Sequence, residues 1–132
     1  MRRVALLPVP LFLVTFCLTA CGDSTGPQPI TSGVWTGSTT GMALEFTVNA
    51  AADGITEIVY TFSGLQCGGQ TLSSGTITSS QTPAWPISNR QFQITRSSDP
   101  TIDITGTFGN DGTTVSGTWE WDTCSGTWTG LD

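Results

Sequence analysis

Met42-Ala43-Leu44-Glu45-Phe46-Thr47-Val48 decides the fold of this chain, because its large apolar residues recur at every second position. A period of two is typical of a β-strand that buries one face and exposes the other. A second run with the same period covers Glu57 to Phe62, and Ala51-Ala52-Asp53-Gly54 lies between the two runs. Since an Asp-Gly pair supplies the positive φ angles that a tight turn demands, the sequence predicts an antiparallel hairpin here.

The same pattern continues toward the C-terminus. Two further alternating runs, residues 102–108 and 115–121, flank the turn residues Gly109-Asn110-Asp111-Gly112. Shorter strands are expected at residues 92–94 and 76–79, whereas Pro83 and Pro86, on either side of Trp85, indicate a loop or an edge crossing. The chain from residue 32 to residue 132 is therefore expected to form an all-β domain, an antiparallel meander of about eight short strands.

A repeat at the two ends of this domain bears on its architecture. Ser32-Gly33-Val34-Trp35-Thr36-Gly37 closely matches Ser125-Gly126-Thr127-Trp128-Thr129-Gly130. Matching strands at the ends of a meander become neighbours when the sheet closes, and closure removes both exposed edges. The repeat thus favours a closed or nearly closed β-barrel, with a β-sandwich as the alternative. Glycines that precede aromatic residues, as at Gly106 and Gly117, are expected to make room for a large ring on an adjacent strand.

The N-terminal segment has the build of a secretory signal peptide. Arg2 and Arg3 precede a short apolar run, which ends in Leu18-Thr19-Ala20-Cys21. These four residues resemble the lipobox of bacterial lipoproteins. The resemblance implies a signal peptide over residues 1–20 and an acylated cysteine, Cys21, at the new N-terminus. The alternative is an ordinary signal peptide cut after Ala20.

Residues 21–31 would then form the lipidated cysteine and a flexible tether, because Gly22 to Pro29 are mostly small or proline. The predicted location is the bacterial cell envelope, with the protein held in a membrane through the lipid on Cys21. Which leaflet holds the lipid is left open by the sequence.

Two cysteines, Cys67 and Cys124, remain in the predicted domain. In an oxidising compartment they are expected to form a disulfide. Closing a loop of this length stabilises a fold by about 4 kcal/mol in the chain-entropy model. Two free reactive thiols are the alternative, but no cation or histidine lies near them in sequence to lower a thiol pKa.

Charge and composition narrow the possible functions. The chain has no histidine and no lysine, and loss of Arg2 and Arg3 with a signal peptide would change its formal net charge from −6 to −8. Nucleic-acid binding is not expected, since no basic face exists to neutralise phosphates. The chain is predicted not to be an enzyme and to need no cofactor.

Acidic residues supply the remaining chemical alternatives. A carboxylate-dependent hydrolase is conceivable through Glu45 and Glu57 on neighbouring predicted strands. Calcium is conceivable through scattered aspartates, but the spacing of a twelve-residue calcium loop is absent and Asp111 fits a turn more simply. No metal site is therefore predicted.

Tryptophans are the candidate ligand-binding residues. Trp35, Trp119 and Trp128 lie on predicted strands, where burial in the core is the simpler role. Trp85 lies between prolines, either in an exposed turn that anchors a partner or packed over an open end of the sheet.

Gly33-Val34-Trp35 resembles the G-x-W motif on the first strand of calycin barrels, the lipocalin and avidin-like group. That resemblance implies binding of a small ligand in the barrel mouth, although residues 126–132 lack the basic residue that lipocalins carry on the last strand. The domain is also similar to small uncharacterised secreted bacterial β domains, which implies no activity.

The sequence therefore predicts an envelope lipoprotein whose β domain has a non-catalytic binding or structural role. Its partner would be an unknown envelope protein or a small ligand. A calycin-like carrier, with a cavity lined by Trp35, Phe46, Trp119 and Trp128, is the alternative, and a carboxylate-dependent hydrolase is the third.

Overall fold

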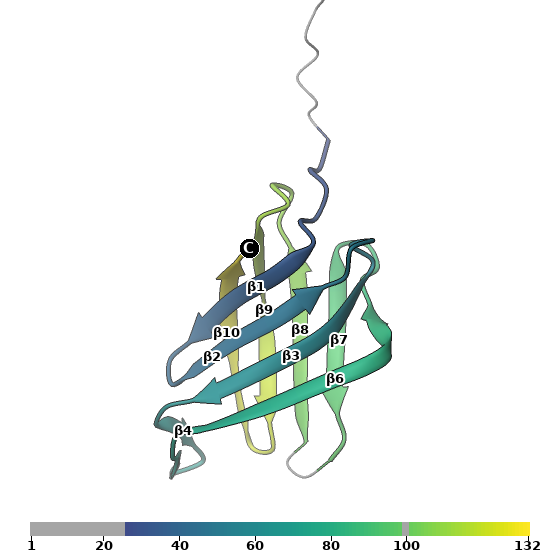
Figure 1. The fold of residues 1–132 in the computed structure, drawn as a ribbon. Coiled ribbons are helices and arrows are strands. Elements are labelled where there is room, and N and C mark those ends of the chain that lie inside the picture. Colours follow the sequence, from purple (N-terminus) through teal and green to yellow (C-terminus); the bar gives the residue numbers. More distant parts are fainter. Residues whose placement is uncertain (1–25, 99–100) are drawn as a thin grey trace, which may run out of the picture.

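Ten β-strands and no helix make up the part of the chain that the structure, a computed structural model, describes: residues 26–98 and 101–132. Eight strands form one antiparallel sheet, and two form a separate hairpin (Figure 1). In chain order the strands are β1 Gly33–Thr39, β2 Met42–Val48, β3 Gly54–Phe62, β4 Leu65–Cys67, β5 Gln70–Leu72, β6 Gly75–Pro86, β7 Gln91–Arg96, β8 Ile102–Phe108, β9 Thr114–Trp121 and β10 Cys124–Leu131. No helix long and apolar enough to cross a membrane occurs within these described ranges.

The large sheet curls into a nearly closed barrel. Its strand order is β6-β3-β2-β1-β10-β9-β8-β7. Neighbouring strands follow one another in the chain, except that the β4–β5 hairpin separates β3 from β6 and that β1 and β10 come from the two ends of the domain. The first and last strands pair as the terminal repeat predicted, with Gly37 opposite Gly130 and Ser38 opposite Thr129. The two edges, β6 and β7, follow one another in the chain. The all-β meander and its near closure into a barrel are therefore confirmed.

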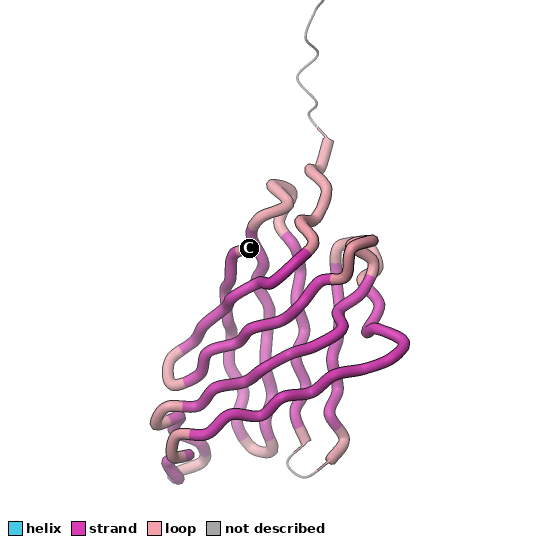
Figure 2. The backbone as a smooth tube through the Cα atoms, viewed as in Figure 1, coloured by secondary structure: helices cyan, strands magenta, loops and turns pink. Residues whose placement is uncertain are grey.

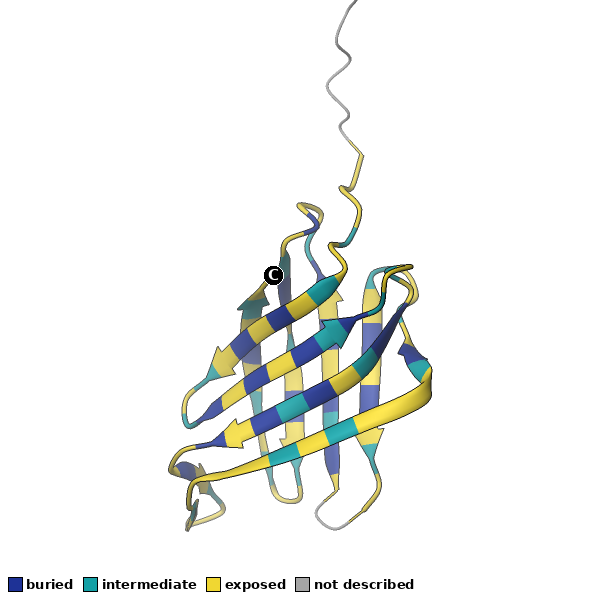
Figure 3. Cartoon of the chain, in the orientation of Figure 1, coloured by how far each residue is buried: buried dark blue, intermediate teal, exposed yellow. Residues whose placement is uncertain are grey.

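Burial alternates along the strands, as the period of two predicted (Figure 3). In β2 the four large apolar side chains are buried and the residues between them are more exposed. The side chains that turn inward form one hydrophobic core between the two layers of strands. The largest fully buried members are Trp35, Trp128, Tyr60, Phe46 and Phe108.

Glycines on the inner face give room to aromatic rings. A Cβ atom built at Gly106 would lie 2.3 Å from the Phe92 ring on β7, which is directly opposite in the register. Likewise, a Cβ at Gly126 would lie 2.6 Å from Trp119 Nε1 on β9. The prediction that a glycine makes room for a ring on the adjacent strand is thus confirmed for Gly106. Gly117 differs, because a Cβ there would meet a backbone oxygen of β8 at 1.8 Å rather than a ring.

The turn between β2 and β3 differs from the predicted Asp-Gly turn. Its positive φ angle, 56°, belongs to Ala52. Gly54 instead begins β3, where a Cβ would approach Ala84 Cβ to 2.7 Å. The glycine is therefore needed for close packing between strands rather than for turn geometry. In the segment where the sequence predicted the later turn, Gly112 has a φ of 76°.

Trp85 does not lie in an exposed turn. The strand β6 continues through Pro83 to Pro86, and Trp85 is only 8% exposed and pairs with Ile55. The prolines are accommodated because β6 is an edge strand whose register with β3 shifts in this region. The alternative prediction, in which the ring packs onto the sheet, agrees with this burial.

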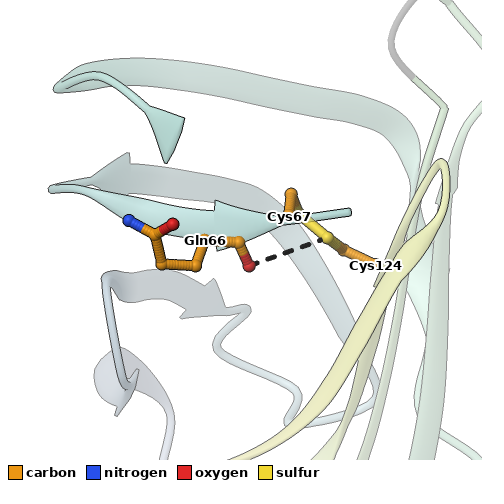
Figure 4. Close-up of a disulfide and its surroundings, with 3 residues drawn as sticks. All are labelled: Gln66, Cys67 and Cys124. Atoms are coloured by element: carbon orange, nitrogen blue, oxygen red, sulfur yellow. Dashed lines mark hydrogen bonds between the residues drawn. A yellow bond between two sulfur atoms is a disulfide. The ribbon is translucent and has the colours of Figure 1, made fainter. Parts of the chain in front are cut away.

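The hairpin of β4 and β5 lies beside one end of the barrel (Figures 1 and 2). Leu65 at its start is buried in the core, and Cys67 forms the predicted disulfide with Cys124 at the start of β10. The two Cα atoms are 5.3 Å apart. The carbonyl oxygen of Gln66 lies 3.8 Å from Cys124 Sγ (Figure 4). The disulfide thus joins the hairpin to the β9–β10 turn.

The residues that precede β1 contact the opposite end of the barrel. The Gln28 amide donates to the carbonyl of Asn110 at 2.7 Å, and the Thr31 amide donates to that of Gly112 at 3.2 Å. The Arg90 guanidinium donates to the Gln28 carbonyl at 2.8 Å and to the Gly109 carbonyl. The predicted tether boundary at residue 31 stays a prediction, and Cys21 and the signal segment lie outside the described residues.

Candidate functional site

The strand tryptophans proposed as ligand-binding residues are all in the core. Trp35 is fully buried on β1, and Trp119 and Trp128 are 5% and 2% exposed on β9 and β10. The Trp35 indole donates to the Thr31 carbonyl at 2.9 Å, and the Trp128 indole donates to the Thr105 carbonyl at 3.0 Å. The indole nitrogens of Trp35 and Trp128 are therefore occupied by backbone carbonyls. A ligand-binding role for these residues stays a prediction.

Aromatic rings occupy the interior where a carrier would hold its ligand. The Phe46 ring lies 6.0 Å from Trp35, 5.4 Å from Phe92 and 5.9 Å from Trp128, measured between centroids. Phe108 adds an edge contact to Trp35 at 4.9 Å. These separations are those of directly packed aromatic pairs. Three of the four residues expected to line a cavity thus belong to one packed cluster.

Two buried polar atoms in this core have no hydrogen-bond partner among the described residues: Tyr60 Oη and Trp119 Nε1. Burial raises the pKa of the Tyr60 phenol far above its usual value, and the charge of Arg96 opposes this shift only in part. The phenol is therefore neutral at physiological pH. It contributes to the core as an uncharged ring.

The acidic residues considered for catalysis are exposed on the outer face. Glu45 pairs with Val59, and Glu57 pairs with Thr47, so the two carboxylates are on adjacent strands but two positions apart. Neither lines the outer groove described below. The described residues contain no cluster of three or more acidic, cysteine or histidine side chains that could hold a metal ion.

Asp111 has the turn role that the sequence predicted. Its carboxylate accepts hydrogen bonds from the Thr113 amide at 3.0 Å and from the Thr114 amide and hydroxyl at 2.9 and 2.8 Å. These donors stabilise the charged form, so they lower the pKa of Asp111, with the Thr113 amide having the largest effect. The carboxylate orders the β8–β9 turn.

An outer groove crosses β1, β10, β9 and β8 and has a volume of about 760 Å³. Its exposed lining side chains are hydroxyl-bearing apart from Leu131, which is 58% exposed. Gly37 and Gly130, opposite one another in the register, contribute only backbone atoms. The lining residues are Thr36, Gly37, Ser38, Thr107, Phe108, Gly109, Thr114, Val115, Ser116, Thr129, Gly130 and Leu131. We call this feature the outer groove.

Strand pairing arranges the hydroxyls of the outer groove in a row. Ser38 on β1 is opposite Thr129 on β10, which is opposite Ser116 on β9, which is opposite Thr107 on β8. All four side chains are exposed. Because adjacent strands are about 4.8 Å apart, the row presents hydroxyl groups at that interval.

A second row lies beside the first but outside the groove. It consists of Thr127, Thr118 and Thr105, again in cross-strand register. Here the hydroxyls of Thr105 and Thr118 are hydrogen-bonded to each other at 2.7 Å. Among the hydrogen bonds of the described residues, none joins the side chains of the first row to one another. The first row therefore keeps its hydroxyls available to a ligand.

The sequence did not predict the outer groove. The groove combines residues of β1 with residues of β8, β9 and β10. In the sequence, only the terminal repeat and the frequency of threonine at outward positions pointed to this surface. No protein-family model matches the chain, and no curated protein or solved structure was found to be similar to it.

Proposed function

We propose that this protein is a lipid-anchored envelope protein whose β-barrel binds a ligand in the outer groove and catalyses no reaction. The observation that carries the proposal is the contrast between the two faces of the sheet. The inner face is packed with aromatic rings, whereas the outer face has an open groove of about 760 Å³. A binding role on the outer face needs no cavity within the barrel.

The anchor in this proposal is the lipid on Cys21, as the lipobox-like sequence implies. One acyl chain binds a membrane only marginally, so the two or three chains of a bacterial lipoprotein would be needed for durable attachment. The contacts of Gln28 and Thr31 with the β8–β9 turn support this geometry, because they hold the described residues that precede β1 at one end of the barrel (Figure 1). That end would face the membrane.

The first experiment tests the anchor. The full chain is expressed in a bacterial host with Cys21→Ser or, as a matched control, Cys17→Ser in the signal segment. Mass spectrometry of the unaltered protein and of Cys17→Ser should show a product that begins at an acylated Cys21 and sediments with membranes. The Cys21→Ser protein should lose the acyl mass and the membrane association. An unacylated, freely released product from the unaltered gene would refute the anchor.

The second experiment separates outer-face binding from an internal carrier. A ligand inside the barrel would contact Trp35 and Trp128 and change tryptophan emission, whereas a ligand in the outer groove should leave these buried rings unchanged. Amide shifts on β1 and β10 with constant tryptophan emission are the expected result. A large emission change upon binding would instead favour the calycin-like carrier.

A further inference from the structure

The lining of the outer groove restricts the charge of its ligand. No lining residue is acidic or basic. An ionic group placed there would lose hydration without gaining a counter-charge, which is strongly unfavourable. An anion would in addition approach a chain with a formal net charge of −6. The groove therefore suits a neutral ligand.

The first row of hydroxyls, from Ser38 to Thr107, restricts the polarity of the ligand as well. A purely apolar ligand would remove water from Ser38, Thr129 and Ser116 without replacing their hydrogen bonds, which is unfavourable. A ligand with its own hydroxyls can replace those bonds. The threonine methyl groups and the exposed Leu131 side chain meanwhile offer apolar contacts.

A pyranose ring has this combination of groups, with hydroxyls at its edge and C–H groups on its faces. The row of Ser38, Thr129, Ser116 and Thr107 also repeats across four strands at about 4.8 Å, so it can make the same contact with successive units of a chain. We propose that the outer groove binds a neutral saccharide chain that lies along this row. The inference rests on the proposed function and names the ligand class of the same groove.

Saturation-transfer NMR tests this inference on the mature, lipidated protein in nanodiscs of phosphatidylcholine. The neutral probes are maltohexaose, cellohexaose and N-acetylchitohexaose, and hexagalacturonate is the charged probe. At least one neutral probe should receive saturation and hexagalacturonate should receive none. Thr129→Val, which keeps the shape but removes the central hydroxyl, should weaken binding about two- to tenfold.

Thr127→Val is the matched control, since Thr127 is exposed on the same strand two residues away and does not line the groove. It should leave the affinity within about twofold, the scale of a surface substitution. Equal effects of the two substitutions would overturn the inference, as would absence of binding by all three neutral probes.

A neutral Gly-Ser dodecapeptide distinguishes failure of the ligand class from failure of the groove. Binding of this peptide that depends on Thr129, with no saccharide bound, would overturn the ligand class and retain the groove. If neither the saccharides nor the peptide bind in a manner that depends on Thr129, the groove itself loses its proposed role. Acylation of Cys21 is measured separately and does not depend on either result.

Discussion

Gly106→Ala tests the packing of rings against glycines on the inner face. The added methyl group would lie 2.3 Å from Phe92 Cε1 and Cζ, a distance that real Cβ contacts do not show. The Phe92 ring has little room to move, because its centroid is 5.4 Å from Phe46, 5.6 Å from Phe108 and 6.3 Å from Trp128. The substitution must therefore shift several rings.

Overpacking of this kind costs about 1–3 kcal/mol in a well-packed core. For a domain of this size, each kcal/mol lowers the melting temperature by about 4–8 °C. Urea unfolding followed by circular dichroism measures the free energy of unfolding directly. Gly75→Ala is the control, since a Cβ at Gly75 meets nothing within 4 Å. That protein should be about as stable as the unaltered one, or up to about 1 kcal/mol more stable.

A double-mutant cycle identifies the ring that causes the loss. Phe92→Leu alone should destabilise the domain, because it removes part of a buried ring. Combined with Gly106→Ala, it should destabilise by less than the sum of the two single changes, since the smaller side chain relieves the clash. The reasoning is refuted if Gly106→Ala unfolds at the same urea concentration as Gly75→Ala, or if the two core changes are additive.

Three further outcomes are expected. Replacing both Cys67 and Cys124 by alanine should lower the free energy of unfolding by up to about 4 kcal/mol, measured by urea unfolding; an unchanged midpoint would contradict a stabilising role for the disulfide. Because the Thr113 and Thr114 donors hold the folded-state pKa of Asp111 below its ordinary value, its carboxylate stabilises the turn at pH values above that ordinary pKa, and the contribution is lost as the pH falls through the lowered pKa. Asp111→Asn should therefore flatten the pH dependence of stability in this acid range, and an unaltered acid titration would count against the assignment. Arg90→Gln should increase hydrogen exchange of the amides of Gln28, Ile30 and Thr31, measured by mass spectrometry; equal exchange would show that the arginine does not hold this segment.

Much of the fold follows from local information in the sequence. Alternation along residues 42–48 and 57–62 predicts strands because the side chains of a strand point to opposite faces in turn. The repeat of residues 32–37 and 125–130 predicted the β1–β10 pairing, and the Cys67–Cys124 disulfide followed from the number of cysteines left in the domain. These features depend on residue type, spacing and count, which the sequence contains directly.

Other features depend on neighbours that the sequence does not identify. Trp85 was assigned either to an exposed turn or to packing on the sheet, and only the path of β6 beside β3 shows that it is buried. Gly54 has the residue pattern of a turn, but its close approach to Ala84 arises from pairing across the sheet. The β4–β5 hairpin was not predicted, since strands of three residues are too short for a reliable period.

The sequence by itself determined most strands of the large sheet, the order in which they form a meander and the cysteines that form the disulfide. Only the tertiary structure brought together the residues of the outer groove, where we propose that a ligand binds. The tryptophans that were candidate ligand-binding residues in the sequence are buried in the core, because burying their large apolar area stabilises a small domain. The outer groove exists because closure of the barrel places β1 beside β10, so that hydroxyls such as those of Ser38 and Thr129, far apart in the chain, lie in one row.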